Sequence, residues 1–136
     1  MKPLAVMLSA SLATTVAQAD TITVHLQVKT ELGNINVAAF KSQAAFDSGN
    51  FTAGTRRKAT IGKMSLVLEG LTPGAYGIVT FQDYNGNGVL DRNALGVPTE
   101  PFGFAKNPRV RFKAPTFQEF AIKFSGSPKE ITIQLN

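Results

Sequence analysis

Apolar and polar side chains alternate along several short stretches of this chain, and that period of two residues constrains the fold more than any other feature. The stretch "TITVHLQVK" puts four aliphatic side chains on one face and His25 on the other. "MSLVLE", "EFAIKF" and "KEITIQL" repeat the pattern, and "INVAAFK" and "AYGIVTFQD" are two further apolar stretches. Turn residues in "ELGN", "LTPGAY" and "SGSPK" separate them, and the only helical signal is one short turn in "NVAAFKSQAAF". The sequence therefore predicts an all-β, antiparallel β-sandwich of about seven strands with one long loop.

Residues 1–19 have the pattern of a secretory signal peptide. Lys2 precedes a short apolar run, and "AQA" predicts cleavage after Ala19. The run is too short to span a membrane comfortably. We therefore predict that residues 20–136 form a single β-sandwich domain, periplasmic or secreted, with no integral membrane segment in the mature chain.

The composition excludes several classes of site. The chain has no cysteine, so disulfides, thiolate catalysis and cysteine-based zinc sites are excluded. It has 14 Lys and Arg against 9 Asp and Glu, and removal of Lys2 leaves 13 against 9, a net charge of +4. This charge favours anionic surfaces without naming a partner, and it is too low to indicate a nucleic-acid binder.

The alternation stops between Asn85 and Pro108, where the sequence is rich in Gly, Asn and Pro. A loop of this length is uncommon inside a compact domain unless it is functional, metal-bound or disordered. It contains apolar residues that disordered segments usually lack, among them Leu95, Phe102 and Phe104. We expect this loop to be ordered, with Phe102 and Phe104 pinning it onto the sandwich.

The start of the loop, "DYNGNGVLD", has the spacing of a calcium-binding loop. Asp83, Asn85, Asn87 and Asp91 fall at side-chain ligand positions, and the backbone carbonyl of Val89 falls at another. Calcium is a hard cation that takes six to eight oxygen ligands, which alternating Asp and Asn residues around tight glycine turns can supply.

The calcium pattern is incomplete, because Ala94 stands where a bidentate glutamate is expected. Asn93 and Glu100 are the candidate additional ligands. With so few carboxylates the site would be weak, with a dissociation constant of about 10⁻⁴ to 10⁻³ M. The alternative is that the segment is a turn in which Asp83 and Asp91 accept local backbone hydrogen bonds. The sequence leaves both interpretations open.

The segment "LTPGAYGIVTFQDYNGNGVLDRNALGVPTEPFGFAKN", with the later "PTFQEFAIKF" and "KEITIQLN", closely resembles the uncharacterised bacterial family catalogued as domain of unknown function 2141. The resemblance covers essentially the mature chain. It implies a secreted, immunoglobulin-like β-sandwich of the transthyretin (prealbumin) or carboxypeptidase-regulatory type. The loop is also similar to calcium loops of bacterial surface adhesins. The family commonly has Ser where this chain has Ala105, and it has no assigned activity.

Residues suited to catalysis are few. His25 is the only histidine, and the alternation places it on the outward face of a strand. No nucleophile elbow is present. A hydrolase using Asp83 and Asp91 as paired carboxylates is the weakest alternative, since the chain has no Trp to form a sugar platform. We predict that the protein is not an enzyme.

One basic stretch, "NPRVRFKAP", alternates Arg109, Arg111 and Lys113 along one face of an expected strand. These cations predict either an anion- or partner-binding face or an edge strand protected by charge against pairing with other chains. The sequence as a whole predicts a non-enzymatic binding or structural module of the cell envelope, with a weak structural calcium loop and an unknown protein or envelope glycan as partner. The alternative is a calcium-responsive adhesion or protein-interaction module.

Overall fold

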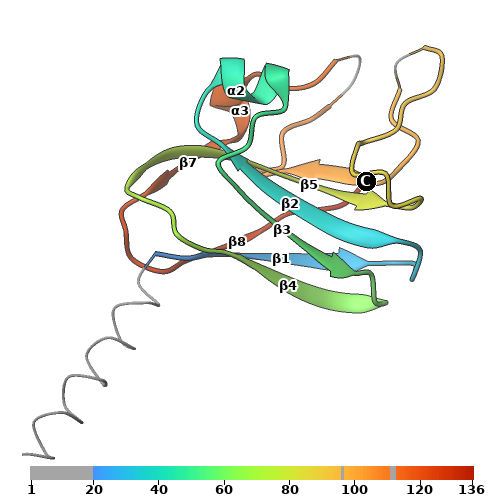
Figure 1. Cartoon of the computed structure of the whole chain (residues 1–136), viewed down its shortest axis with the longest axis horizontal. Helices are drawn as coiled ribbons and strands as arrows, with labels where there is room; N and C mark the ends of the chain where they lie inside the picture. The colour runs from blue at the N-terminus through green and yellow to red at the C-terminus, as the bar shows by residue number, and fades with distance from the viewer. Residues whose placement is uncertain (1–19, 96, 111–112) are drawn as a thin grey trace, which may run out of the picture.

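The computed structural model describes residues 20–95, 97–110 and 113–136. They form two packed sheets (Figure 1). One sheet consists of β1 (Ile22–Val28), β4 (Gly62–Leu68) and β8 (Lys129–Thr132), in the order β4-β1-β8. The other consists of β2 (Asn34–Phe40), β3 (Ala53–Lys58), β5 (Gly74–Asp83), β6 (Phe102–Phe104) and β7 (Ala121–Phe124), in the order β3-β2-β5-β6 with β7 also paired to β5. The predicted all-β sandwich is confirmed, with eight strands in the described residues.

The alternating aliphatic residues of the sequence form the core between the sheets. Val24 of β1 lies in register with Leu66 of β4 and Ile131 of β8, and the first two are almost completely buried. Ile35 and Ile78 of the second sheet join the same cluster. Burial of such side chains is the main source of stability in a chain that has no disulfide.

The prediction that the strands are all antiparallel is wrong for one pair. β8 runs parallel to β1, with Ile22 opposite Lys129 and His25 opposite Thr132. The turn "SGSPK" does not close a hairpin within one sheet, because β7 belongs to one sheet and β8 to the other. A strand that enters from the opposite layer can align with β1 in either direction.

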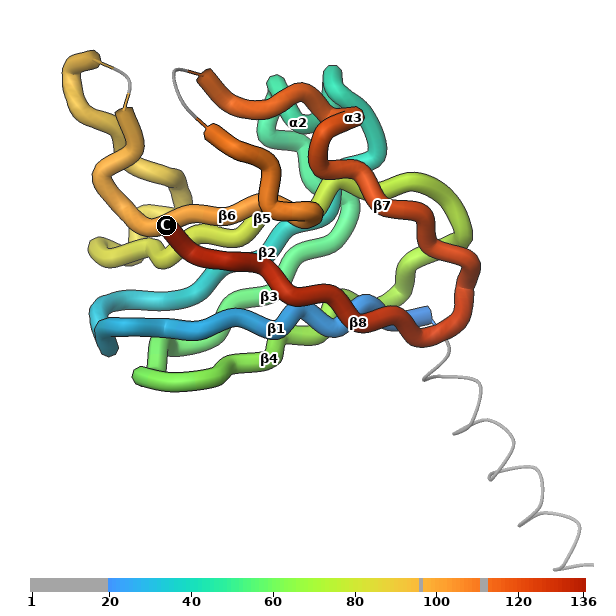
Figure 2. The backbone as a smooth tube through the Cα atoms, turned by 180° about the vertical axis from the view of Figure 1, so that it is seen from behind, coloured from blue at the N-terminus to red at the C-terminus, as the bar shows by residue number. Residues whose placement is uncertain are grey.

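The C-terminus joins the two sheets beside β6. The backbone groups of Phe102 and Asn136 exchange hydrogen bonds of 3.2 and 2.9 Å. The chain passes so close to Gly103 that a Cβ there would lie 2.3 Å from the carbonyl oxygen of Gln134. Figure 2 shows the C-terminal segment running along β6 to its end at the base of the long loop.

Aromatic side chains form a second cluster on the outer face of the β2-β5 sheet. Two short helices cover it, α2 (Gln43–Ser48) and α3 (Phe117–Phe120). The ring of Phe104 packs edge-on against Phe120 with centroids 5.0 Å apart, and Phe46 packs against Phe120 at 4.9 Å. Phe104 is 6% exposed, so the expectation that it pins the loop onto the sandwich is confirmed.

The helical turn expected in "NVAAFKSQAAF" corresponds to α2, which Ser42 caps by accepting a hydrogen bond from the Ala45 N–H at 3.1 Å. α3 was not expected. No helix among the described residues is long and apolar enough to cross a membrane. The predicted signal peptide, residues 1–19, lies outside the described residues.

Candidate functional site: a hydrogen-bonded loop beside an apolar crevice

Residues 84–101, here called the long loop, connect β5 to β6. The loop stands on the same side of the sheet as residues 105–116, here called the second loop. Figures 1 and 2 show both loops rising beside β6.

The end of β5, where the long loop begins, is fixed from below. Gln82 is 2% exposed, and its Nε2 donates to the carbonyl oxygens of Thr30 and Leu32 at 2.9 and 2.8 Å. Gly33 has a φ of +65°, and a Cβ there would lie 1.9 Å from the carbonyl oxygen of Asp83. The β1–β2 turn therefore packs against the end of β5 and buries Asp83.

Asp83 holds the first turn of the long loop. Its carboxylate is 0% exposed. Oδ1 accepts a hydrogen bond from the Gly86 N–H at 3.1 Å, and Oδ2 accepts one from the Gly88 N–H at 2.7 Å. Both glycines have positive φ, +74° and +79°, which other residues rarely adopt. This explains why the segment alternates Gly with polar residues.

The other predicted metal ligands meet around Asp91. The Nδ2 groups of Asn85 and Asn87 donate to the two carboxylate oxygens of Asp91 at 2.6 and 2.7 Å. Their Oδ1 atoms accept hydrogen bonds from the N–H groups of residues 87 and 89 at 3.2 and 3.0 Å. These are Asx turns, and they are made by Asn85 and Asn87, whereas the turn alternative predicted from the sequence assigned the local backbone hydrogen bonds to Asp83 and Asp91. Asp83 and Asp91 thus hold the same Asn-Gly-Asn-Gly turn from two sides.

Glu100, near the C-terminal end of the long loop, binds back to residues earlier in the loop and holds its base together. It is 5% exposed. Oε2 accepts a hydrogen bond from the Tyr84 N–H at 2.8 Å, and Oε1 accepts one from the Asp91 N–H at 2.9 Å. Sixteen residues separate Glu100 from Tyr84. From the sequence, Glu100 is only a candidate additional metal ligand, and this bracing role was missed.

The tip of the long loop is a small hairpin that displays apolar side chains. Arg92 and Pro98 form a β-bridge. Asn93 Oδ1 accepts hydrogen bonds from the N–H groups of Leu95 and Val97 at 2.9 and 3.1 Å. Leu95 is 88% exposed and Val97 is 54% exposed. The loop therefore orders its own backbone while leaving these two side chains in solvent.

The oxygen chemistry of the long loop fits a hard cation only in part. Among the described residues, no three His, Cys, Asp or Glu side chains gather as a metal-binding group. The carboxylate of Glu100 and Oδ1 of Asn93 are already bound to backbone N–H groups. Asn85, Asn87 and Asp91 do converge, and the carbonyl of Val89 follows in the same turn. A rotation of the two amides by half a turn would present their oxygens, the atoms that calcium prefers.

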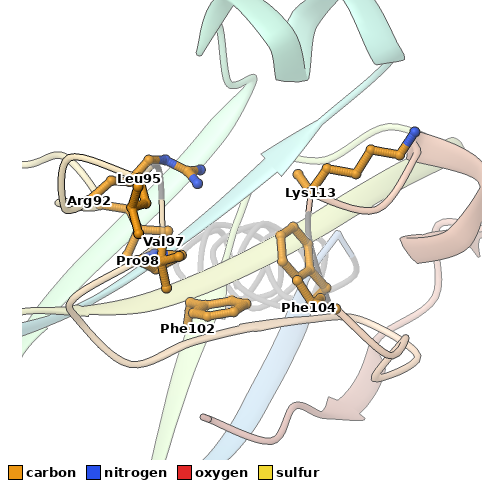
Figure 3. A pocket seen from close by; sticks show the side chains of 10 residues that line it. Arg92, Leu95, Val97, Pro98, Phe102, Phe104 and Lys113 are labelled. Atoms are coloured by element: carbon orange, nitrogen blue, oxygen red, sulfur yellow. The ribbon is translucent and has the colours of Figure 1, made fainter.

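A crevice of about 170 Å³, lined mainly by apolar side chains, lies between the two loops (Figure 3). Phe102 and Phe104 of β6 form its floor. Leu95, Val97 and Pro98 line it from the long loop, and Val110 and Lys113 line it from the second loop. Leu95, Phe102 and Phe104 were singled out from the sequence, but their meeting with the second loop could not be predicted, because it depends on the pairing of β6 with β5.

The strand expected around Arg109 and Lys113 is not present at the described positions of this stretch. Arg109 is exposed in irregular backbone, and Lys113 lies at the edge of the crevice. Arg111 lies outside the described residues. The interpretation as a charged edge strand is therefore wrong where it can be checked, and the stretch forms one wall of the crevice.

Comparison with known proteins agrees with the resemblance inferred from the motifs. The family model described as an uncharacterised protein conserved in bacteria, DUF2141, matches residues 22–132. The chain belongs to the DUF2141 family. No curated protein and no solved structure matches it. The family match spans the sandwich, the long loop and the second loop, and its description assigns no activity.

A second polar constellation of this DUF2141 chain was missed in the sequence. On the outer face of the β4-β1-β8 sheet, His25 Nδ1 lies 2.7 Å from Ser65 Oγ and His25 Nε2 lies 2.7 Å from Glu130 Oε1. The outward position of His25 was predicted correctly. Ser65 and Glu130 could not be found, because they reach His25 only through the register of three strands, one of them parallel. The side chain of Glu130 is 73% exposed, as expected for a solvated surface pair.

Proposed function

We propose that this DUF2141 protein is an exported, non-enzymatic binding module of the bacterial cell envelope, and that its ligand enters the crevice between the two loops. The observation that carries the proposal is the construction of the long loop. Three carboxylates, those of Asp83, Asp91 and Glu100, all accept hydrogen bonds from within the loop. Yet this well-braced loop leaves Leu95 and Val97 exposed beside an apolar crevice. Ordered apolar side chains around a concavity are typical of a binding site.

The geometry gives little support to the hydrolase alternative. Asp83 is fully buried, and both of its oxygens accept backbone hydrogen bonds. A substrate cannot reach such a group without unfolding the turn that it holds. Asp91 is turned toward Asn85 and Asn87. The two aspartates therefore act as structural acceptors in this arrangement, which is the opposite of what paired acid and base catalysis needs.

We further propose that calcium, where it is plentiful outside the cytoplasm, stabilises the exposed half of the long loop. Asn85, Asn87 and Asp91 would hold it by side chain and Val89 by its carbonyl, and the predicted ligand Asp83 would join them only by releasing the N–H of Gly86 or Gly88. The ion would supply charge that ties these oxygens together, and no chemical step would pass through it. Asn93 and Glu100 remain candidate additional ligands, although each would first have to release a backbone N–H.

Thermal unfolding in excess chelator and in ~1 mM calcium, with magnesium as the control ion, tests the calcium proposal. With a dissociation constant near 10⁻⁴ M, binding linkage predicts about 1.4 kcal/mol of stabilisation. For a domain of this size that is a rise in Tm of roughly 3–6 °C. Asp91→Asn should abolish the rise, and Asp47→Asn, in the exposed helix α2, should leave it intact. A rise that survives Asp91→Asn would place the ion elsewhere.

Binding at the crevice is tested by an NMR screen of uncharged, anionic and cationic fragments against the purified protein. Fragments that bind should shift the amide signals of Val97, Phe102 and Phe104 together. Leu95→Ser should weaken the binding of these fragments. Ile61→Ser, which removes a 65% exposed apolar side chain from the β3–β4 turn, should leave their binding unchanged. If no fragment of any charge perturbs the crevice, the proposed binding function fails.

The second candidate function is a calcium-responsive adhesion or protein-interaction module. The 88% exposure of Leu95 favours it, because this side chain extends beyond the crevice, where a protein surface could cover it. In that case chelation of calcium should lower the affinity for an envelope partner, and Leu95→Ser should have the same effect in the presence of calcium.

A further inference from the structure

We propose that the crevice binds a small amphipathic carboxylate, with an apolar group about the size of a benzene ring inside the cavity and the carboxylate at its rim beside Lys113. The inference rests on the proposed function, because it identifies the chemical class of the ligand for the same crevice. Size, lining and charge each contribute one part of it.

The volume limits what can enter. The cavity measures about 170 Å³. An apolar cavity of about 150 Å³ is known to take up one benzene molecule. Phe102, Phe104 and Val110 are among the lining residues, and they offer aromatic and aliphatic surface with no side-chain hydrogen-bonding group. The buried part of the ligand is therefore a single apolar group of ring size.

The charges at the rim determine the sign of the charge that the ligand should carry. Arg92 and Lys113 are the ionisable residues among the described lining residues, and none of these lining residues is acidic. Arg92 already has an interaction of its own. Asp91, its neighbour in sequence, is turned into the loop toward Asn85 and Asn87. The ligand therefore meets a positive rim in which Lys113 is the main partner, and this matches a single negative charge.

The position of Lys113 suits a group that approaches from solvent. In Figure 3 the stem of Lys113 stands beside Phe104, and its ammonium is directed away from the floor at Phe102. Lys113 is exposed, and its long rotatable stem lets the ammonium swing over the mouth of the crevice. A carboxylate attached by a short linker to the buried ring would lie within its reach.

The test is an NMR titration of the purified protein with 3-phenylpropionate and with its neutral counterpart 3-phenylpropionamide. The carboxylate should bind with a dissociation constant of about 1 mM, typical of so small a ligand. The amide should bind about two- to fivefold more weakly, the range expected for one exposed charge pair. Only the carboxylate should lose affinity as salt is raised.

Matched variants locate the two halves of the site. Lys113→Gln should reduce the affinity for the carboxylate to that for the amide, and Lys41→Gln, an exposed lysine near α2, should change neither. Val97→Asp puts a negative charge on the wall and should abolish carboxylate binding, while Val97→Thr keeps the shape and should weaken it only slightly. Val97 is 54% exposed, so both variants should fold.

Three outcomes separate the inference from the function on which it rests. Selective, salt-sensitive binding of the carboxylate that depends on Lys113 supports both. Equal binding of carboxylate and amide at the crevice overturns the ligand class and leaves the binding function standing. Absence of binding by either probe overturns the ligand class, and the wider fragment screen then decides whether the crevice binds anything.

Discussion

Replacing Glu100 by glutamine tests whether a buried carboxylate orders the long loop. Glu100 is 5% exposed, and its two oxygens accept hydrogen bonds from the N–H groups of Tyr84 and Asp91 at 2.8 and 2.9 Å. Glutamine has almost the same shape but only one acceptor oxygen. One of the two N–H groups therefore keeps an acceptor, and the other faces the NH₂ group of the new side chain.

The expected loss of stability follows from these two contacts. A hydrogen bond to a charged group contributes about 1.5–3 kcal/mol, and a buried N–H left without an acceptor costs about 1–3 kcal/mol. Removing a buried charge offsets part of this loss. We therefore expect Glu100→Gln to lower the free energy of unfolding by about 2 kcal/mol, which corresponds to a fall in Tm of roughly 4–9 °C for a domain of this size.

The assay is thermal unfolding followed by circular dichroism in excess chelator, so that calcium does not contribute. Glu69→Gln, which removes an exposed glutamate after β4, is the charge-matched control and should shift Tm by less than about 2 °C. Amide hydrogen exchange at Tyr84 and Asp91 should become faster in Glu100→Gln. An unchanged Tm together with unchanged exchange at both amides would refute the bracing role.

Two other predictions concern the surroundings of the crevice. Gly103→Ala should destabilise the protein by about 1–3 kcal/mol, as overpacking commonly does, because the new Cβ would lie 2.3 Å from the carbonyl oxygen of Gln134. Chemical denaturation measures this loss of stability. An unchanged free energy of unfolding would mean that the C-terminal segment shifts freely. The second prediction concerns the helix cap of α3. Hydrogen bonds from the backbone N–H and hydroxyl of Thr116, helped by the charge of Lys113, lower the pKa of Glu119 from its ordinary value of 4.5. Since the pKa is lowered in the folded state, the cap stabilises α3 above pH 4.5 and loses this effect as the pH falls through the lowered pKa. An NMR titration of the Glu119 carboxyl should have its midpoint below 4.5, and Thr116→Ala should raise it.

The parts of the fold that depend on local patterns could be predicted from the sequence. Alternation in "TITVHLQVK" and "MSLVLE" identified β1 and β4, because each strand buries one face only. The pairing of β8 could not be predicted, since parallel and antiparallel neighbours bury the same residues of a strand. β3 was difficult to predict from the sequence for another reason. It is exposed at most positions, including Arg56 and Arg57, and so has little alternation to detect.

The candidate site likewise has features that the local sequence predicts and features that it does not. The sequence predicted, as one of two alternatives, a turn in which Asp83 and Asp91 accept local backbone hydrogen bonds, and Asp83 does so. The Asx turns themselves are made by Asn85 and Asn87, which the sequence considered only as metal ligands. The role of Glu100 depends on contacts made across nine and sixteen residues of irregular backbone, for which no periodic signal exists. The crevice depends on the placement of β6, a strand of three residues that is too short to show any pattern.

The hydrogen bonds of the long loop also limit what calcium can add. At the base, Asp83 and Glu100 are buried and bound to backbone N–H groups, so the loop has a fixed foundation without any cation. At the exposed end, the hydrogen bonds that the Asp91 carboxylate accepts from described residues come from the side-chain amides of Asn85 and Asn87. A cation would have to replace those two amide contacts, and this exchange reduces the net gain and agrees with a weak site. It follows that Glu100→Gln should lower Tm equally with and without calcium, whereas Asp91→Asn should remove the response to calcium. If Glu100→Gln instead abolished the calcium response, Glu100 would be a metal ligand and the division between base and exposed end would be wrong.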